Sequence, residues 1–263
     1  MLRIACYPKK NMMLAVLMLL TATQWTLAQK GDPKLTEVYS PVPPVVTPGK
    51  SCGDAPSDAI VLFDGSNLDK WRSVKDTTQA AGWTVKDGIL TVNKSAGNIE
   101  TKQSFMDYQL HIEWRIPENI TGSGQARGNS GIFLASTGAG DGGYELQVLD
   151  SYNNPTYVNG QAGSIYKQSI PLANANRKPG EWQVYDIAWS APRFNDDGSV
   201  KTPAKVTVFL NGVLLQNNYE LKGQTLYIGQ PFYKKHGASP IKLQAHGDPS
   251  EPISYRNIWV RPS

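Results

Sequence analysis

The stretch WTVKDGILTV at residues 83–92 decides the fold class, because two alternating segments flank an Asp-Gly pair. Asp87 and Gly88 are residue types that a tight two-residue turn requires, and apolar residues alternate with polar ones on either side. The stretch therefore predicts a β-hairpin. A second stretch repeats this pattern, with VTVFL and VLL joined by the pair Asn211-Gly212.

Short extended segments continue along the rest of the chain. Beyond the two hairpins, eight stretches are strand candidates, at 60–63, 108–116, 131–135, 144–149, 182–189, 224–228, 241–246 and 254–261. No segment of ten or more residues after residue 58 keeps a helical stripe. About eleven short strands joined by Gly- and Asn-rich turns predict an all-β sandwich or barrel.

Alternation in two of these strands separates apolar from polar side chains. In 108–116 the apolar residues point to one side of the strand, and polar residues that include Glu113 point to the other. In 241–246 Gln244 and His246 likewise lie opposite the apolar residues. Two such strands predict a polar, concave sheet face on which both sets of polar side chains lie.

The first 28 residues have the features of an export signal. Lys9 and Lys10 precede an apolar run at 12–20, and the small-x-small sequence TLA ends at Ala28. The run is shorter than the ~20 residues that span a bilayer. The sequence therefore predicts a signal peptide at 1–28, a periplasmic or otherwise exported protein, and no membrane span.

The next segment, residues 29–57, is polar and contains PVPP at 41–44. Because proline fixes φ and donates no backbone hydrogen bond, we expect an extended arm or linker here. The domain itself is predicted to occupy residues 58–263.

The charge of the chain argues against a polyanionic partner. The chain has 26 Lys and Arg against 22 Asp and Glu, a net charge of +4, and three of the basic residues lie in the predicted signal. The mature chain would then carry 23 against 22, or +1, which suits an uncharged ligand and excludes a nucleic-acid-binding surface. Cys52 would be its single cysteine, so we expect no intramolecular disulfide.

The sequence YELQVLD at residues 144–150 is the first candidate for chemistry. Glu145 and Gln147 share one face of a regular strand, and a β-bulge after Gln147 would bring Asp150 to the same side. Glycosidases of the concanavalin-like β-sandwich class align their acidic residues on a strand in this way. Because the middle position is Gln147, the double-displacement machinery of those enzymes is not reproduced in full.

Two further segments carry polar residue types suited to a ligand. RGNSGIF at 127–133 places Asn129 between glycines, which let a backbone approach a ligand closely, but it lacks the ending of a phosphate loop. IKLQAHG at 241–247 ends in His246, which can exchange protons near neutral pH or bind a metal. Arg256 follows in YRNI, residues 255–258.

These segments occur together in the order found in one protein family. The ordered motifs are FDGSNLDKW at 63–71, the hairpin at 83–92, NSGI at 129–132, YELQVLD at 144–150, GSIY at 163–166, GEW at 180–182, LNG at 210–212, LQAHG at 243–247 and RNI at 256–258. The chain resembles the 3-keto-disaccharide hydrolase family over about residues 58–261. The resemblance implies a concanavalin A-like jelly roll of two antiparallel sheets and action on 3-keto-glycosides, sugars whose C3 hydroxyl a separate enzyme has oxidised.

The resemblance and the strand patterns together select the expected site residues. The candidate catalytic residues are Glu145, His246 and Glu113. The candidate substrate-binding residues are Asn129, Gln147, Asp150, Tyr166, Trp182, Gln244 and Arg256.

The expected chemistry follows from the ketone. A 3-keto group acidifies the C2 proton, so the glycosidic bond can break by elimination followed by addition of water, with a base at C2 and an acid at the leaving group. Either Glu145 or His246 is the expected base, and the other, or Glu113, the acid. A divalent metal held by His246 and a carboxylate could polarise the ketone instead.

Two other functions remain open from the sequence. A carbohydrate-binding module without turnover would use the same sandwich. Glu113, Glu145 and His246 gathered around one pocket would favour the enzyme, and the same residues scattered would favour the binding module. An ordinary glycoside hydrolase would use Glu145 and Asp150 as its carboxyl pair.

Overall fold

The computed structural model describes residues 37–38 and 40–263. By its internal contacts the chain divides after Val45, and the strands all belong to the unit Val46–Ser263. The predicted signal peptide and residues 29–36 and 39 of the predicted arm lie outside the described residues.

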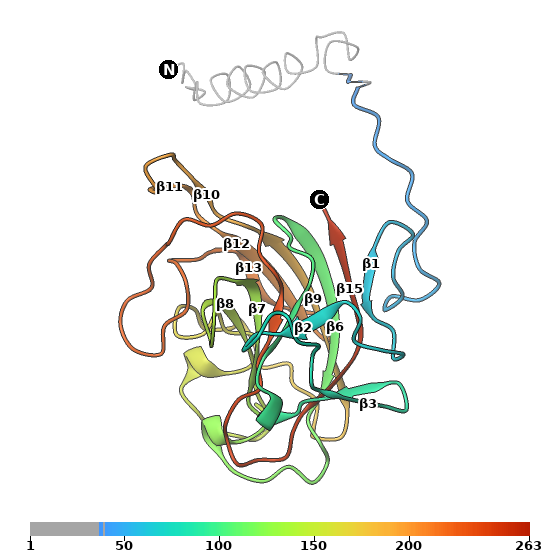
Figure 1. Ribbon diagram of the computed structural model, residues 1–263, viewed down its shortest axis with the longest axis vertical. Coiled ribbons are helices and arrows are strands. Elements are labelled where there is room, and N and C mark those ends of the chain that lie inside the picture. The colour runs from blue at the N-terminus through green and yellow to red at the C-terminus, as the bar shows by residue number, and fades with distance from the viewer. Residues whose placement is uncertain (1–36, 39) are drawn as a thin grey trace, which may run out of the picture. The chain divides into compact units, whose positions relative to one another are not determined.

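Eight strands form the larger sheet (Figure 1). Their order is β13 (Val213–Glu220), β12 (Lys205–Leu210), β9 (Trp182–Ser190), β6 (Tyr108–Arg115), β15 (Ser254–Pro262), β4 (Ile89–Thr91) and β3 (Thr84–Lys86), and β1 (Ile60–Phe63) also pairs with β15.

A five-stranded sheet forms the second layer. Its order is β2 (Trp71–Ser73), β5 (Ile99–Thr101), β14 (Lys242–Leu243), β7 (Ser130–Ser136) and β8 (Gly143–Val148). A separate hairpin pairs β10 (Arg193–Phe194) with β11 (Val200–Thr202), and three 3₁₀ turns complete the described elements: η2 (Lys94–Ala96), η3 (Gly124–Ala126) and η4 (Val158–Gly160). All strand pairs are antiparallel, so the expected two-sheet sandwich of the concanavalin A-like class is confirmed.

Apolar side chains that face inward from both sheets fill the space between them. Tyr144 of β8 packs against Trp189 of β9 with ring centroids 5.5 Å apart, and this contact joins the two sheets. Trp114 and Tyr185 pack in the same interior, also at 5.5 Å. Because burial of one large apolar side chain is worth about 1.5–3 kcal/mol, this interior supplies most of the stabilisation of the fold.

Both predicted hairpins are confirmed, and their turns explain why. Asp87 and Gly88 have φ values of 53° and 77°, and Asn211 and Gly212 have 53° and 81°. Positive φ at both central residues defines the type I′ turn, which matches the twist of the flanking strands. Asp, Asn and Gly tolerate this conformation best, so local sequence chemistry is sufficient to specify both turns.

Two predicted strands differ in the structure. Residues 224–228 make only an isolated bridge from Gln224 to Phe232, and Tyr227 and Ile228 are exposed. The strand predicted at 241–246 shortens to β14, whose two residues pair with β5 on one side and β7 on the other. The three-residue strands β2 and β5 were not predicted, because segments so short carry no readable periodicity.

The sandwich separates the two polar strand faces that the sequence predicted to lie together. Glu113 of β6 belongs to the eight-stranded sheet, whereas Gln244 and His246 follow β14 of the five-stranded sheet. In both sheets the apolar residues face the shared interior, so the polar residues face outward on opposite sides of the sandwich. The prediction of one common concave face was therefore wrong.

The end of the predicted arm packs on the larger sheet. The Gly53 carbonyl accepts hydrogen bonds from Asn257 Nδ2 at 2.7 Å and from Trp259 Nε1 at 3.0 Å. Thr47 and Ser57 join the two ends of the segment through backbone and side-chain hydrogen bonds. We call residues 46–57 the strap, because they cross the outer face of β15.

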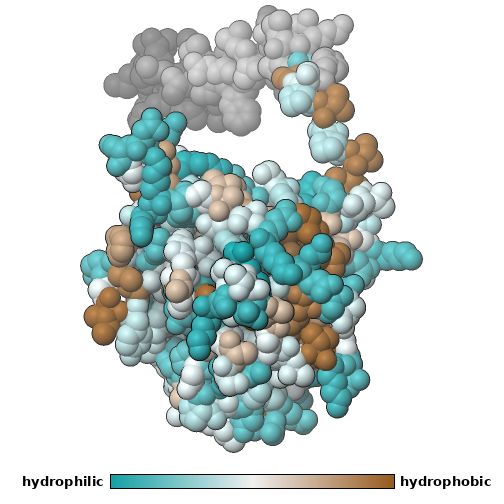
Figure 2. Space-filling view, in the orientation of Figure 1, coloured by the Kyte–Doolittle hydropathy of each residue, from teal (hydrophilic) through white to brown (hydrophobic). Residues whose placement is uncertain are grey.

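In Figure 2 polar side chains cover much of the face in view, and hydrophobic ones gather in separate patches. Within the described part of the chain, no helix is long and apolar enough to cross a membrane.

Candidate active site

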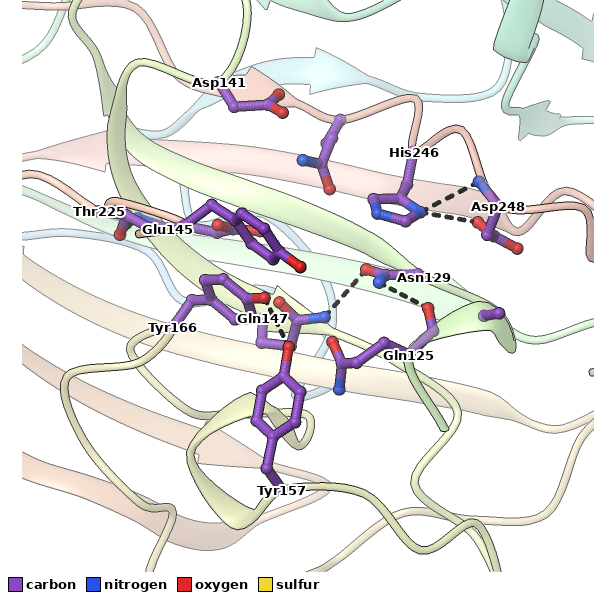
Figure 3. A pocket seen from close by; sticks show the side chains of 13 residues that line it. Gln125, Asn129, Asp141, Glu145, Gln147, Tyr157, Tyr166, Thr225, His246 and Asp248 are labelled. Carbon is purple, nitrogen blue, oxygen red and sulfur yellow. Dashed lines mark hydrogen bonds and ion pairs between the residues drawn. The ribbon is translucent and has the colours of Figure 1, made fainter. Parts of the chain in front are cut away.

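A cavity of about 630 Å³ opens on the outer face of the five-stranded sheet (Figure 3). Its volume lies within the ~300–1,000 Å³ range typical of small-molecule pockets. Six of the ten predicted site residues line it, namely Asn129, Glu145, Gln147, Tyr166, Gln244 and His246. The other lining residues are Gln125, Ala126, Asp141, Tyr157, Thr225, Tyr227 and Asp248.

Two side chains of strand β8 line the cavity, because successive side chains of a strand point to opposite faces of the sheet. The apolar residues of β8 belong to the sandwich interior, so Glu145 and Gln147 project from the opposite face. Gly131 of the neighbouring strand β7 pairs with Gln147, and because glycine has no side chain it leaves room for the carboxyl group of Glu145. A Cβ atom at Gly131 would lie 2.5 Å from Glu145 Oε1, so only glycine admits the carboxyl group in this position.

Glu145 is a buried carboxyl group. Only 6% of the residue is exposed, and no hydrogen bond or ion pair within the described residues reaches its carboxylate. Burial and the nearby negative charge of Asp141 raise the pKa of Glu145 to about 8, although the Lys242 ammonium opposes this shift. Glu145 therefore holds a proton at neutral pH and can act as an acid.

His246 also lines the cavity, and Asp248 orients its imidazole ring. Its Nδ1 is 3.0 Å from Asp248 Oδ2 and 3.2 Å from the backbone nitrogen of the same residue. Within the described residues its Nε2 has no hydrogen-bond partner. Figure 3 shows the ring with one edge turned to Asp248 and the rest turned into the cavity.

Asp248 remains ionised in this arrangement. Burial by itself would raise its pKa, but hydrogen bonds from His246 and Ser250 and the charge of Lys94 outweigh burial and lower the pKa to about 2. Lys94 Nζ lies 3.3 Å from Asp248 Oδ2. The cavity thus combines the protonated carboxyl group of Glu145 with His246, whose ring is held by the ionised carboxylate of Asp248.

Three amide oxygens in the cavity wall lack a hydrogen-bond donor. They are the buried Oε1 atoms of Gln125, Gln147 and Gln244. The amide of Gln147 is fixed, since its Nε2 donates to Asn129 Oδ1 at 2.9 Å. An unsatisfied buried acceptor costs about 1–3 kcal/mol, so a donor that reaches one of these oxygens would be bound favourably. The three oxygens are almost inaccessible to solvent, so a ligand pairs with them only where the cavity wall shifts to expose them.

Tyrosines form another side of the cavity. The hydroxyl groups of Tyr157 and Tyr166 are 2.6 Å apart. Lys167 Nζ lies 4.0 Å from the ring centroid of Tyr227. Aromatic rings with a hydroxyl group at the edge offer an apolar face and a polar contact to the same ligand.

Glu113, Trp182 and Arg256 are not in this cavity. Arg256 Nε donates to Glu113 Oε2 at 2.6 Å, and the guanidinium lies 4.2 Å from the ring centroid of Trp182. This cluster is on the outer face of the eight-stranded sheet, and the packed interior lies between it and Glu145. The sequence predicted one site that contains these three residues together with Glu145 and His246, and the structure separates them. The alternation of apolar and polar residues along a strand does not say which sheet the strand joins.

Asp150 also lies outside the cavity lining. It is fully buried, and its Oδ2 lies 2.7 Å from Arg127 Nε. Its backbone nitrogen donates to the Arg127 carbonyl at 3.3 Å. The carboxylate therefore anchors the segment before β7, and the predicted bulge does not bring it beside Glu145.

A comparison with protein families decides the identity of the fold family. The profile of the 3-keto-alpha-glucoside-1,2-lyase-like domain matches residues 58–261. The chain belongs to this family. The resemblance inferred from the ordered sequence motifs is thereby confirmed.

Several relatives of this 3-keto-alpha-glucoside-1,2-lyase-like chain are known. A 3-keto-disaccharide hydrolase of Bacteroides thetaiotaomicron is 30% identical over 157 residues, which cover 49% of this chain and 51% of the relative. The chain thus matches about half the length of that curated relative. The crystal structure of a presumed glycosyl hydrolase from Parabacteroides distasonis is 62% identical, with a TM-score of 0.82 over 88% of this chain and 97% of the other. A second such structure from that organism, 18% identical with a TM-score of 0.57 over 78% of this chain and 94% of the other, shares the fold.

Sequence reasoning missed several lining residues of this family member. Asp248 follows His246 by two positions, and this spacing was a usable signal for a carboxylate that orients the ring. Asp141, Tyr157 and Tyr227 come from loops that only the tertiary structure brings to the cavity. Among the described residues, no three His, Cys, Asp or Glu side chains form a group that could hold a metal ion.

Proposed function

We propose that this protein is an exported sugar hydrolase that cleaves 3-keto-glycosides or 3-keto-disaccharides by elimination and hydration. One observation carries the proposal: the protonated Glu145 and the Asp248-oriented His246 line one cavity together with three unpaired acceptor oxygens. The name of the Bacteroides thetaiotaomicron relative supports the same substrate class.

The cavity suits an uncharged sugar. The tyrosine rings of its wall can lie against the apolar face of a pyranose, and the three unpaired amide oxygens can accept from sugar hydroxyl groups once the wall shifts to expose them. The amide nitrogen of Gln244 and one hydroxyl hydrogen of the Tyr157–Tyr166 pair are donors that no described residue takes up. Either donor can bind the ketone oxygen.

In the proposed first step, His246 carries its proton on Nδ1 and donates it to Asp248 Oδ2 instead of accepting from the backbone N–H of Asp248, so Nε2 is free to remove the C2 proton. The electron pair of the C2–H bond forms the C1–C2 double bond as the C1–O bond breaks. Glu145 gives its proton to the leaving oxygen. The products of this step are an unsaturated 3-keto sugar and the free aglycone alcohol.

Water completes the reaction. The Glu145 carboxylate takes a proton from water as its oxygen bonds to C1, and His246 returns the proton to C2. The sum of both steps consumes one water molecule and restores both side chains.

Two alternatives are weaker. An ordinary glycosidase needs a pair of carboxyl groups across the scissile bond, but Asp150, the predicted partner of Glu145, is paired with Arg127 outside the cavity. The other two carboxyl groups of the lining, Asp141 and Asp248, are held by Asn98 and by His246. The separate position of Glu113 is what a binding module without turnover would allow, but such a module does not need a protonated carboxyl group and a carboxylate-oriented histidine in the same cavity, and Glu145 and His246 do share one.

The decisive experiment compares a 3-keto-disaccharide with its unoxidised parent, with and without a chelator. We expect cleavage of the keto sugar alone, because only the ketone acidifies C2. Glu145→Gln and His246→Ala should each lower kcat/KM at least about 100-fold, since general acid and base groups contribute 10²–10⁴-fold. Loss of activity with chelator would instead favour a metal-polarised ketone.

Solvent deuterium provides the control for the mechanism. In ²H₂O, deuterium appears on C2 of the released keto sugar when the proton held by His246 exchanges with solvent before it returns. Equal cleavage of both substrates would contradict the proposal, whereas hydrogen retained at C2 means that His246 returns the abstracted proton before it exchanges.

A further inference from the structure

A buried lysine lies beneath the loop that borders the cavity. Lys242 of β14 has no exposed surface, and its ammonium lies 4.9 Å from the ring centroid of Phe133. Its Nζ donates to the carbonyl oxygens of Gly138, Gly140 and Gly142 at 3.0, 2.9 and 2.9 Å. All three ammonium hydrogens are thus used, and no carboxylate of the described residues lies within 4.0 Å of Nζ.

The three carbonyl groups belong to the loop between β7 and β8. They alternate along residues 138–142, so the loop turns every second carbonyl toward the same ammonium. Gly138 and Gly140 have φ values of 142° and 60°, which side chains rarely adopt, and this explains the glycines. The loop is therefore shaped around a fixed positive charge.

The loop carries Asp141 into the cavity lining. Asp141 lies between two of the glycines whose carbonyls bind Lys242, and Asn98 Nδ2 donates to its Oδ1 at 2.9 Å. Figure 3 draws Asp141 toward the Glu145 side of the cavity, away from Asp248. Asn98 also holds the Gly140 carbonyl at 3.0 Å, so the position of Asp141 is tied to that of the loop.

We propose that Lys242 is a positioning residue whose ammonium fixes the glycine-rich loop, and that the loop thereby holds the Asp141 carboxylate in the lining of the cavity that also contains Glu145. Any catalytic use of Glu145 rests on the proposed function; the positioning of Asp141 does not. The charged and titratable groups that act on Glu145 are Asp141 from the loop, Lys242 from β14, and Tyr157 and Tyr166 from the segment after β8.

The test is a titration of the Glu145 carboxyl carbon by ¹³C NMR in the substrate-free protein, with E145Q assigning the signal. Removing the Asp141 charge should favour the ionised form of Glu145, so D141N should lower its pKa by about 0.5 unit or more. In the K242M background the loop loses its anchor. There the same D141N change should shift the pKa by less than about 0.2 unit.

Two results would overturn the inference. An equal effect of D141N in both backgrounds means that Lys242 does not position Asp141, and no effect in the wild-type background means that Asp141 does not act on Glu145. If K242M does not fold, K242L replaces it, because its side chain likewise donates no hydrogen bond to the loop carbonyls. The exposed residues Asp69 and Lys86 provide matched controls, and D69N and K86M should leave the titration unchanged.

Kinetics separates this inference from the proposed function. If the enzyme cleaves 3-keto-glycosides through Glu145, D141N should move the alkaline limb of the kcat/KM profile to lower pH in parallel with the NMR titration. An enzyme that shows the NMR coupling but cleaves no 3-keto-glycoside would refute the proposed function and leave the role of Lys242 intact.

Discussion

Two carboxyl groups of one cavity have opposite protonation preferences. Glu145 is buried without a donor and keeps its proton, whereas Asp248 accepts hydrogen bonds from its neighbours and stays ionised. Environments that push two pKa values apart allow one group to act as an acid while the other orients a base. Both carboxyl groups are largely buried, so the difference between their pKa values comes from the hydrogen-bond donors around Asp248, which Glu145 lacks.

Gly131 offers a direct test of how closely Glu145 must be positioned. Its φ permits alanine, but the added Cβ would displace the Glu145 carboxyl group. Because a displacement of about 1 Å can cost 100-fold in rate, Gly131→Ala should lower kcat/KM on a 3-keto-disaccharide by about that factor. Steady-state kinetics checks the loss, and circular dichroism checks that the variant folds.

The matched control for this substitution is Gly237→Ala. A Cβ at Gly237 would meet no atom within 4 Å, so this variant should keep full activity. Wild-type activity in the folded Gly131→Ala variant would show that Glu145 need not lie where the structure has it.

At the scale of elements, the strap and the strands beneath it form a polar cluster far from the cavity. His111 Nδ1 lies 2.7 Å from Asp186 Oδ1, and its ring stacks on Trp259 with centroids 5.1 Å apart. Asn257, which binds the Gly53 carbonyl, also donates to Glu113 Oε1 at 2.9 Å. His111 and Glu113 on the outward face of β6 are thus buried, and Asn257 connects Glu113 to the strap.

Because of this cluster, the free energy of unfolding should fall as the pH becomes alkaline. Burial alone would lower the pKa of His111, but the hydrogen bonds to Asp186 and Glu113 outweigh burial and raise it from 6.5 to about 9. The folded state therefore binds the proton more tightly than the unfolded state. Its contribution is fully present below pH 6.5 and disappears as the pH rises through 9.

We expect a loss of about 1–2 kcal/mol from His111 between pH 6.5 and 9, discounted for solvent screening. Urea unfolding at both pH values, compared between the wild type and His111→Gln, isolates this contribution because other groups titrate in both proteins. The same pH-dependent loss in His111→Gln would contradict it. His236→Gln is the control and should keep the alkaline loss, since the pKa of His236 is lowered by burial.

At the scale of the whole molecule, the sandwich needs neither disulfides nor a strong charge. Two sheets enclose an interior rich in large apolar side chains, and Cys52 is the free cysteine of the described residues. Without the predicted signal peptide the chain would be nearly neutral, which suits the uncharged sugar of the proposed function. Electrostatic interactions with such a sugar would then come from individual charged residues of the cavity and not from the net charge of the protein.

Export is the corresponding prediction for the whole chain. Expressed with its native N-terminus in a Gram-negative host, the protein should be found in the periplasm and begin at Gln29, since Ala28 ends the predicted signal. N-terminal sequencing of the periplasmic fraction measures this directly. A cytoplasmic protein that keeps Met1 would refute the prediction.

The amino-acid sequence by itself determined the features that depend on neighbouring residues. Asp87-Gly88 and Asn211-Gly212 specify their turns through φ preferences, and alternation along β8 is sufficient to put Glu145 and Gln147 on one face. The ordered motifs identified the family, because a set of weak local signals in one order is specific.

Only the tertiary structure decided which of these faces meet. Alternation relates a side chain to its own strand and carries no information on the sheet that the strand joins, so Glu113 was grouped with His246 although the interior separates them. Asp141 reaches the cavity on a loop held by the distant Lys242. Contacts between residues about 100 positions apart depend on the packing of the whole chain, which no local pattern records.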